Sequence, residues 1–118
     1  MKFLITGGAG FVGSHIAEEL TRSKKDEVVV FDNLSVGKKN NVPKGCRFIK
    51  GDIRNPEEIT KAANGADTIF HNAAFVSVRK SFDMPKEELD NNVYGALNVL
   101  EAAVKNKVKK FVFASSMA

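Results

Sequence analysis

The sequence predicts an α/β protein built on a doubly wound parallel sheet with the strand order 3-2-1-4-5. Apolar, strand-like runs alternate with segments of helical period along the chain. These runs are apolar throughout, which is typical of strands buried on both faces of a sheet. A glycine-rich turn joins the first strand to the first helix. Right-handed crossovers between such strands produce the doubly wound order.

The opening stretch, MKFLITGGAGFVGS, organises the rest of the chain. Its apolar run at 2–6 predicts a buried strand, and glycines follow at Gly7, Gly8, Gly10 and Gly13. A strand, a glycine turn and a helix in this order aim backbone N–H groups and the positive end of a helix dipole at a phosphate. We therefore predict a nucleotide-phosphate site here, with a purely structural turn as the alternative.

The next elements complete the first half of the sheet. The first helix is expected to continue to about Arg22, on a four-residue repeat of Val12, Ile16 and Leu20. The apolar run at 27–31 predicts the second strand. Residues 33–45 are rich in Gly, Pro, Ser, Asn and Lys, so they predict a loop with at most a short helical turn. Residues 47–50 predict the third strand.

A complete helix start opens the second half. Asn55 is an N-cap residue, Pro56 suits the first helical position, and two acidic residues follow in the first turn. The inward positions are expected to be Ile59, Ala62 and Ala63. The pair Asn64-Gly65 predicts a left-handed end to this helix. Residues 67–71 then predict the fourth strand.

Residues 72–85 have no clear period and predict a loop, and a long helix is expected at 86–106. One face of that helix carries Leu89, Val93, Leu97, Leu100 and Val104. We interpret this stripe as core packing, because it spans too few heptads for a coiled-coil seam. A fifth strand at 108–114 would be an apolar sheet edge, which invites pairing with another chain.

Composition limits the function further. The chain has 118 residues and a single cysteine, Cys46, so it is expected to be one domain without an internal disulfide. No apolar run approaches the ~20 residues of a membrane span, and no signal peptide is visible, so we expect a soluble, cytoplasmic protein with no membrane contact. The net charge of +4 comes from scattered lysines, which we read as a solvated face and not a nucleic-acid site. The two histidines, His15 and His71, have no partners at metal-ligand spacing, so no metal site is predicted.

Acidic residues end two of the strands. Asp32 lies roughly twenty residues after Gly13, where a carboxylate accepts hydrogen bonds from the adenosine ribose of a dinucleotide. A carboxylate there repels the 2′-phosphate of NADP, so NAD is the expected cofactor. The alternative is a loop cap that bonds its own backbone. Asp52 ends the third strand in the same way, and with Ile53 it is placed to meet the adenine ring.

Several further segments have the order and spacing of one family. They are TGGAGFVGSH at 6–15, DNLS at 32–35, GDI at 51–53, HNAA at 71–74, SV at 77–78, NNVYGALN at 91–98 and FASS at 113–116. On these motifs the chain resembles the extended short-chain dehydrogenase/reductase family, and within it the nucleotide-sugar epimerases and dehydratases, with the UDP-glucose 4-epimerases nearest. The resemblance covers the whole chain and implies a Rossmann-type dinucleotide-binding domain at 1–118.

The resemblance also implies roles for individual residues. The cofactor-binding set would be the turn glycines Gly7, Gly10 and Gly13, the pyrophosphate-binding amides of Phe11 and Val12, the ribose-binding Asp32 and Asn33 with Ser35 and Gly37 nearby, the adenine-binding Asp52 and Ile53, the cofactor-lining Ala73 and Ala74, and Asn92 on the long helix. Ser116, with Ser115 as its neighbour, would share a proton network with the reacting sugar hydroxyl.

The chain departs from the family pattern in three places. Asn72 replaces an apolar residue, and Val76 stands where some epimerases place a lysine on the cofactor. The family's catalytic Tyr-x-x-x-Lys pair is absent: the single tyrosine, Tyr94, is followed four residues later by Asn98, and the chain ends two residues after Ser116. The later strands of the sheet and a substrate domain are absent as well.

Three hypotheses follow. The first is the NAD-binding portion of a nucleotide-sugar epimerase or dehydratase, inactive as this chain alone. The intact enzyme would oxidise a sugar hydroxyl with NAD and return the hydride to the other face. The alternatives are a portion of an NAD(P)-dependent carbonyl reductase of the same family, or a non-catalytic NAD-binding or interaction module. The partners expected are a nucleotide-sugar substrate of the intact enzyme and a second copy of the chain, through the 86–106 helix, which the family uses for dimers, or through the sheet edge.

Overall fold

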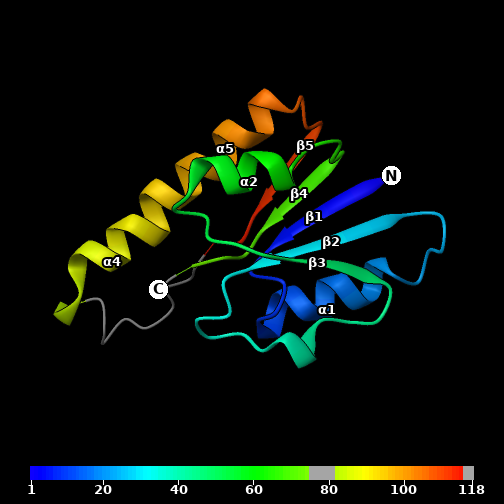
Figure 1. Cartoon of the computed structure of the whole chain (residues 1–118), viewed down its shortest axis with the longest axis horizontal. Coiled ribbons are helices and arrows are strands. Elements are labelled where there is room, and N and C mark those ends of the chain that lie inside the picture. Colours follow the sequence, from blue (N-terminus) through cyan, green and yellow to red (C-terminus); the bar gives the residue numbers. More distant parts are fainter. Residues whose placement is uncertain (75–81, 116–118) are drawn as a thin grey trace.

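A computed structural model describes residues 1–74 and 82–115, and it contains a five-stranded parallel sheet (Figure 1). The strand order is β3-β2-β1-β4-β5, as the sequence predicts. The strands are β1 (Lys2–Thr6), β2 (Glu27–Asp32), β3 (Cys46–Lys50), β4 (Thr68–His71) and β5 (Lys110–Phe113). The order reverses between β1 and β4, so the carboxyl ends of these two strands flank the place where ligands bind in doubly wound sheets.

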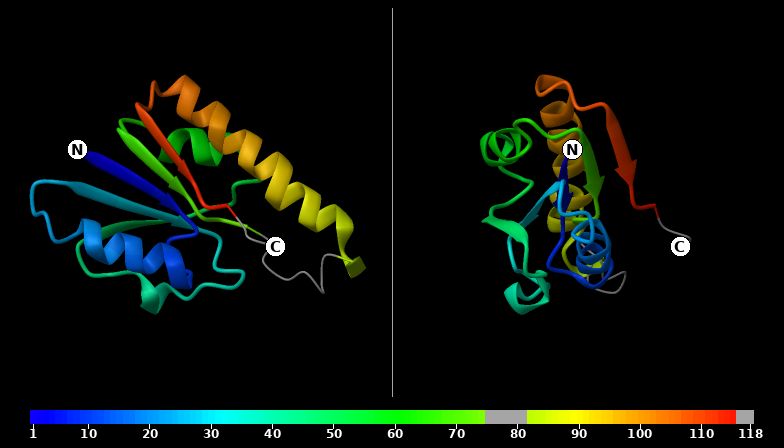
Figure 2. Two further views of the ribbon diagram at one scale, coloured as in Figure 1. Left: turned by 180° about the vertical axis from the view of Figure 1, so that it is seen from behind. Right: turned by 90° about the vertical axis from the view of Figure 1, so that its right-hand side faces the viewer.

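Helices cover both faces of the sheet. The helix α1 (Phe11–Leu20) lies on one face, and α2 (Pro56–Ala62) and α5 (Gly95–Lys105) lie on the other (Figures 1 and 2). Helix α4 (Pro85–Leu89), a π-helical turn η2 (Asp90–Tyr94) and α5 follow one another without a break as one long helix. A short 3₁₀ turn, η1 (Lys39–Asn41), is the helical turn expected in the loop after β2.

Each face of the sheet has its own apolar layer. Along β1, Leu4 packs toward α2 and α5 while Ile5 packs toward α1. All of β2 after its first residue is buried. Successive strand residues point to opposite faces, so a run that is apolar throughout is the pattern required by two covered faces.

The start of α2 is as predicted. The Asn55 Oδ1 accepts hydrogen bonds from the backbone N–H groups of Glu57 and Glu58, at 3.1 and 3.3 Å. The expected inward residues are all buried: Ile59, Ala62 and Ala63. Gly65 has a φ of +77°, the left-handed conformation expected where this helix ends.

The apolar stripe of the long helix is not in the core, and our interpretation of it was wrong. The exposed fractions of its residues are Leu89 42%, Val93 53%, Leu97 48%, Leu100 44% and Val104 78%. The buried face of α5 is made instead of small residues around one larger one: Ala96, Val99, Ala102 and Ala103. Small side chains let the helix axis approach the sheet and α2 closely, which leaves the larger residues beside them outside.

Helix α1 shows the same effect at its start. Val12 is 57% exposed, whereas Gly13 and Ala17 are buried against the sheet.

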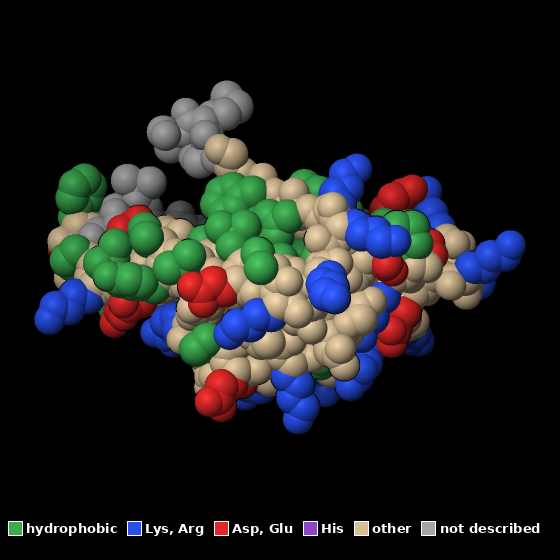
Figure 3. Space-filling model, turned by 90° about the horizontal axis from the view of Figure 1, so that it is seen from above, with side chains coloured by type: hydrophobic (Ala, Val, Ile, Leu, Met, Phe, Trp, Pro, Cys, Tyr) green, Lys and Arg blue, Asp and Glu red, His purple; other side chains and the backbone are tan. Residues whose placement is uncertain are grey.

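Figure 3 shows hydrophobic side chains gathered on the face formed by the long helix and β5. Within the described residues β5 pairs only with β4, and Phe113 on it is 53% exposed. None of the described helices has the length and apolar character needed to cross a membrane.

Candidate functional site

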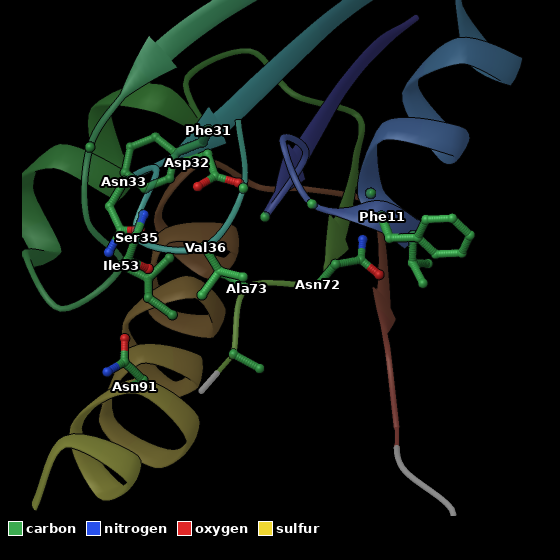
Figure 4. A pocket seen from close by; sticks show the side chains of 17 residues that line it. Phe11, Phe31, Asp32, Asn33, Ser35, Val36, Ile53, Asn72, Ala73 and Asn91 are labelled. Atoms are coloured by element: carbon green, nitrogen blue, oxygen red, sulfur yellow. The ribbon is translucent and has the colours of Figure 1, made fainter. Parts of the chain in front are cut away.

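A crevice of about 320 Å³ opens at the carboxyl ends of the strands (Figure 4). It lies at the switch point of the sheet, where doubly wound folds bind their ligands. Its lining comes from the glycine turn, the ends of β2 and β4, the turn after β3 and the π-helical turn. The lining residues are Gly7, Gly10, Phe11, Val12, Gly13, Phe31, Asp32, Asn33, Ser35, Val36, Gly37, Gly51, Ile53, Asn72, Ala73, Ala74 and Asn91.

The glycine turn brings three chain segments into contact. Gly7 has a φ of +69°, and a Cβ at this position would lie 2.7 Å from the Ala73 nitrogen. A Cβ on Gly13 would overlap the Gly7 carbonyl oxygen. The turn therefore excludes side chains at both positions, because the start of α1 and the segment after β4 pack directly on its backbone.

The first turn of α1 leaves its N–H groups available to a ligand. Its N-cap residue, Gly10, has no side chain to cap with, and the first turn carries no acidic residue. The first helical hydrogen bond runs from Ser14 N to Gly10 O at 3.0 Å. The N–H groups of Phe11, Val12 and Gly13 precede that bond and lie at the crevice, where together with the helix dipole they favour an anion.

Asp32 faces the same turn from the end of β2. Its Oδ2 accepts a hydrogen bond from Ala9 N at 3.0 Å, and its Oδ1 accepts one from Leu34 N at 2.8 Å. The second bond is the loop cap that we considered as the alternative role. Each carboxylate oxygen keeps capacity for another donor, so the cap leaves room for two ribose hydroxyls. The residue is only 8% exposed, and a buried carboxylate here disfavours a neighbouring phosphate.

The loop after β2 folds back over the glycine turn. Ala9 O accepts hydrogen bonds from Lys38 N at 3.2 Å and from the Asn41 Nδ2 at 3.0 Å. A Cβ on Gly37 would lie 2.6 Å from the Ala9 backbone. Glycine at this position is therefore explained by packing of the chain on itself. Ser35 and Gly37 both line the crevice.

Asp52 is not one of the residues that line the crevice, whereas its neighbours Gly51 and Ile53 are. The carboxylate accepts hydrogen bonds from Arg54 N and Nε on one oxygen, at 2.8 and 3.0 Å. Its other oxygen accepts from Arg54 Nη2 at 2.7 Å and from Asn33 Nδ2 at 3.2 Å. The hydrogen bonds from Arg54 lower the pKa of Asp52 to about 2. Because four bonds fill the carboxylate, a donor on a ligand would have to displace one of them.

A buried pair supports the other side of the glycine turn. The Thr6 Oγ1 accepts hydrogen bonds from Asn72 N and Ala73 N, both at 3.2 Å, and lies 2.6 Å from the His71 Nδ1. The hydroxyl has one proton, which goes to His71 Nδ1, and we infer that the ring proton of His71 is on Nε2. Burial lowers the pKa of His71 to about 4, so the ring is neutral near pH 7.

The two asparagines of the π-helical turn lie on different surfaces. Asn91 lines the main crevice, on the side of Ile53 (Figure 4). Asn92 lines a second hollow of about 200 Å³, together with His71, Asn72, Ala73, Ala74, Phe113, Ala114 and Ser115. The Asn92 Nδ2 donates to the Glu88 carboxylate at 3.2 Å. The cofactor role expected for Asn92 stays a prediction, and Asn91 is a further candidate.

The structure brings most of the predicted cofactor residues to one crevice. Residues that line it without having been predicted are Phe31, Val36, Gly51, Asn72 and Asn91. Gly51 and Asn91 lie within quoted motifs, so their position beside predicted residues was an available signal. The predicted Ser116 lies outside the described residues, as do Val76 and the 77–78 segment. Across 1–74 and 82–115, no three His, Cys, Asp or Glu residues are grouped as a metal site would require.

The fold is a Rossmann-type α/β fold, and its crevice lies where folds of this class bind dinucleotides. A model of the NAD dependent epimerase/dehydratase family matches residues 3–118. The chain belongs to this family.

This chain spans 37–38% of the length of the relatives described here. A putative UDP-glucose 4-epimerase of Methanocaldococcus jannaschii is 42% identical over 115 residues, which are 96% of this chain and 37% of that protein. The structure of Thermus thermophilus UDP-glucose 4-epimerase in complex with NAD is similar over 98% of this chain and 38% of its own, with a TM-score of 0.92 and 44% identity. The Thermotoga maritima UDP-glucose 4-epimerase with UDP-glucose has a TM-score of 0.93 and 37% identity, over 98% of this chain and 38% of its own.

Proposed function

We propose that this chain is the NAD-binding portion of an epimerase of nucleotide sugars, of the UDP-glucose 4-epimerase kind. The observation that carries the proposal is the buried Asp32 carboxylate facing the uncapped start of α1. The carboxylate suits ribose hydroxyls and the helix start suits a pyrophosphate, and both line the same crevice. The relatives named as UDP-glucose 4-epimerases support the sugar-nucleotide class.

In this proposal, each segment of the crevice binds a different portion of NAD. The N–H groups of Phe11 and Val12 bind the pyrophosphate, and the Asp32 carboxylate accepts hydrogen bonds from the adenosine ribose. Ile53 packs against the adenine ring. Ala73 lies at both the crevice and the second hollow, so the nicotinamide end lies toward it. NAD, when bound, supplies an acceptor for the hydride of a sugar C–H bond.

By itself this chain is expected to bind NAD without epimerising a sugar. Epimerisation needs a base for the sugar hydroxyl proton, and the only tyrosine, Tyr94, lies on the exposed helix with Asn98 four residues on. His71 does not replace that base, because it is buried and its Nδ1 is occupied by Thr6. Conversion of UDP-galactose to UDP-glucose by the purified chain would refute this part of the proposal.

Calorimetric titration tests the cofactor part. We expect NAD and ADP-ribose to bind with similar affinity, because the chain's contacts are with the adenosine and pyrophosphate. NADP should bind at least about 10-fold more weakly, since its 2′-phosphate meets the Asp32 carboxylate. Asp32→Asn should weaken NAD and reduce this preference, whereas Asp26→Asn, whose carboxylate pairs with the N-terminus, is the control. Equal affinity for NAD and NADP, or far tighter binding of NAD than of ADP-ribose, would contradict this site.

We also propose that two copies of the chain associate through the exposed stripe of the long helix. The stripe consists of Leu89, Val93, Leu97, Leu100 and Val104, and a row of exposed large apolar side chains along one helix is typical of an interface. Light scattering should show a dimer that Leu97→Glu converts to a monomer. The control Glu101→Gln changes an exposed charge on the same helix. A wild-type chain that is monomeric at all concentrations contradicts the proposal.

A further inference from the structure

A chain of hydrogen bonds ties the end of β2 to the turn after β3 at the rim of the crevice. Arg54 donates to Asp52 through Nε at 3.0 Å and Nη2 at 2.7 Å. Asp52 accepts in turn from the Asn33 Nδ2 at 3.2 Å. The Asn33 Oδ1 accepts from Ser35 N at 2.9 Å. Arg54 is therefore connected through Asp52 to Asn33, which lines the crevice, although Arg54 is not one of the lining residues.

The chain of bonds leaves Asn33 one orientation. Its amide oxygen is used by Ser35 N and its nitrogen by the Asp52 carboxylate, so a flip of the amide would break both bonds. The carboxylate is itself held by two parallel bonds from a planar guanidinium, which fixes its rotation as well as its position. Asn33 and Ser35 are thus presented together at the side of the crevice next to Ile53 (Figure 4).

Other charged groups surround this turn. The hydrogen bonds to Asp52 raise the pKa of Arg54, and the charges of Asp90 on η2 and Glu87 on α4 raise it further. On the other side, the Glu58 Oε2 of α2 accepts a hydrogen bond from Asp52 N at 3.0 Å.

We propose that Arg54 is a positioning residue for the adenosine side of the crevice, acting through Asp52 to hold Asn33 and the loop after β2 in the binding conformation. This inference rests on the proposed nucleotide site. Without the guanidinium, Arg54 N still holds the Asp52 Oδ1, but the Oδ2 loses its bond to Nη2 and can turn away from Asn33. The ligand must then order the rim as it binds. That ordering lowers affinity even where no contact with the ligand is lost.

The first test is calorimetric titration of the full chain with ADP-ribose. Arg54→Gln should raise the dissociation constant about 5–10-fold, since an amide cannot replace the charged fork. Arg54→Lys keeps the charge but not the fork, and should recover only part of the affinity. Arg22→Gln is the matched control: it breaks an exposed pair with Glu19 on α1, away from the crevice, and should change affinity less than about 2-fold.

The second test separates positioning from a general loss of structure. NMR titration of the Asp52 carboxyl should show its low pKa rise toward the ordinary range in Arg54→Gln. The substitution leaves the other charged side chains around the turn in place: Glu58, Glu87 and Asp90. The side-chain NH₂ signals of Asn33 should shift in the same variant. The thermal midpoint should change little, because the Arg54 side chain is 45% exposed.

The outcomes are distinguishable. If the wild-type chain binds neither ADP-ribose nor NAD, the proposed function fails, and this inference fails with it. If the wild-type chain binds but Arg54→Gln binds equally well, only the role of Arg54 is overturned. Equal weakening by Arg54→Gln and Arg22→Gln would also overturn it, because the effect would then be one of net charge. Weakening confined to the Arg54 variants, together with the Asn33 shifts, supports it.

Discussion

Two helices begin near the crevice, and they begin in opposite ways. Helix α2 starts at Asn55, whose side chain accepts from two backbone N–H groups, and acidic residues fill its first turn. Helix α1 starts at Gly10, with no side-chain cap and no acidic residue in its first turn. The chain satisfies the start of α2 by itself and leaves the start of α1 to something outside the chain. We propose that this partner is the pyrophosphate of NAD, because a helix start of this kind favours an anion.

The difference extends to what surrounds each helix start. Around α2, Glu58 also accepts from the Asp52 backbone, so the helix start and the turn before it form one closed set of bonds. Around α1, the neighbouring groups brace the turn from two sides, with Asp32 bonded to Ala9 N and Thr6 bonded to Ala73 N. The bonds around the start of α2 stabilise the fold. The bonds around the start of α1 hold the glycine turn in one conformation and leave the N–H groups of the first turn without a side-chain cap.

The largest expected effect comes from closing the glycine turn. Gly7→Ala places a Cβ against Ala73 N at a positive φ, and should lower the free energy of unfolding by about 3 kcal/mol or more. Gly65→Ala is the matched control, because its φ is also positive but the nearest atom is 3.8 Å away. It should cost about 1–2 kcal/mol. Urea denaturation measures both, and equal losses would mean that the contact with Ala73 is unimportant.

A side-chain cap introduced at Gly10 should satisfy the N–H groups at the start of α1, as Asn55 does at the start of α2. Gly10 has an extended φ of −83°, which any residue adopts, and a Cβ there would meet only Gly7 O, at 3.3 Å. Gly10→Asp should therefore keep the fold but weaken NAD about 30-fold, because its carboxylate occupies the N–H groups and repels the pyrophosphate. Gly10→Ser adds a cap without a charge and should weaken NAD less. Unchanged NAD affinity in the Asp variant would place the phosphate elsewhere.

The buried histidine beside the turn should make stability depend on pH. The pKa of His71 is about 4 in the folded chain and about 6.5 when unfolded, so the unfolded chain binds more protons between these values. The contribution of His71 to the free energy of unfolding is therefore complete above pH 6.5 and is lost as the pH falls toward 4. Between pH 7 and pH 5 the free energy of unfolding should fall by about 2 kcal/mol. His71→Gln should flatten this slope in urea denaturation, whereas His15→Gln, at the exposed surface of α1, should keep it. A slope retained in His71→Gln would assign it to other groups.

The smallest effect should come from removing the cap of α2. Asn55→Ala loses two hydrogen bonds to backbone N–H groups and should lower the free energy of unfolding by about 1 kcal/mol. The affinity for NAD should stay within about 2-fold of wild type, because this helix start does not line the crevice. Loss of NAD affinity equal to that of Gly10→Asp would erase the contrast between the two helices.

Much of this site was predictable because it is local. The cap at Asn55, the left-handed Gly65 and the glycine turn are each encoded within a few residues, and the structure contains all three. The place of Asp32 beside the glycine turn was predictable from its spacing, and its bond to Leu34 N is the local loop cap considered from the sequence. Its bond to Ala9 N was not predictable, because it joins segments that only the assembled sheet brings together.

The stripe of the long helix shows why pattern alone misled. The positions occupied by large apolar residues have helical spacing, yet the face turned to the sheet is the alanine-rich one. A helical period shows only that one face of a helix is more apolar than the other. Which face is buried depends on packing: α5 approaches Ile53 so closely that Gly95 has no room for a Cβ. The same approach and the π-helical turn decide that Asn91 faces the crevice while Asn92 faces the second hollow.

The sequence by itself determined the order of the sheet and the uncapped start of α1, because strand composition, helix caps and glycine conformations are properties of short segments. It predicted the strand ends only to within one or two residues: the fifth strand was expected at 108–114, and β5 spans Lys110–Phe113. The tertiary structure alone decided the links between segments: Thr6 with His71, Arg54 through Asp52 to Asn33, and the buried face of α5. These depend on distances between residues remote in sequence, and such distances exist only once the sheet and its helices have packed.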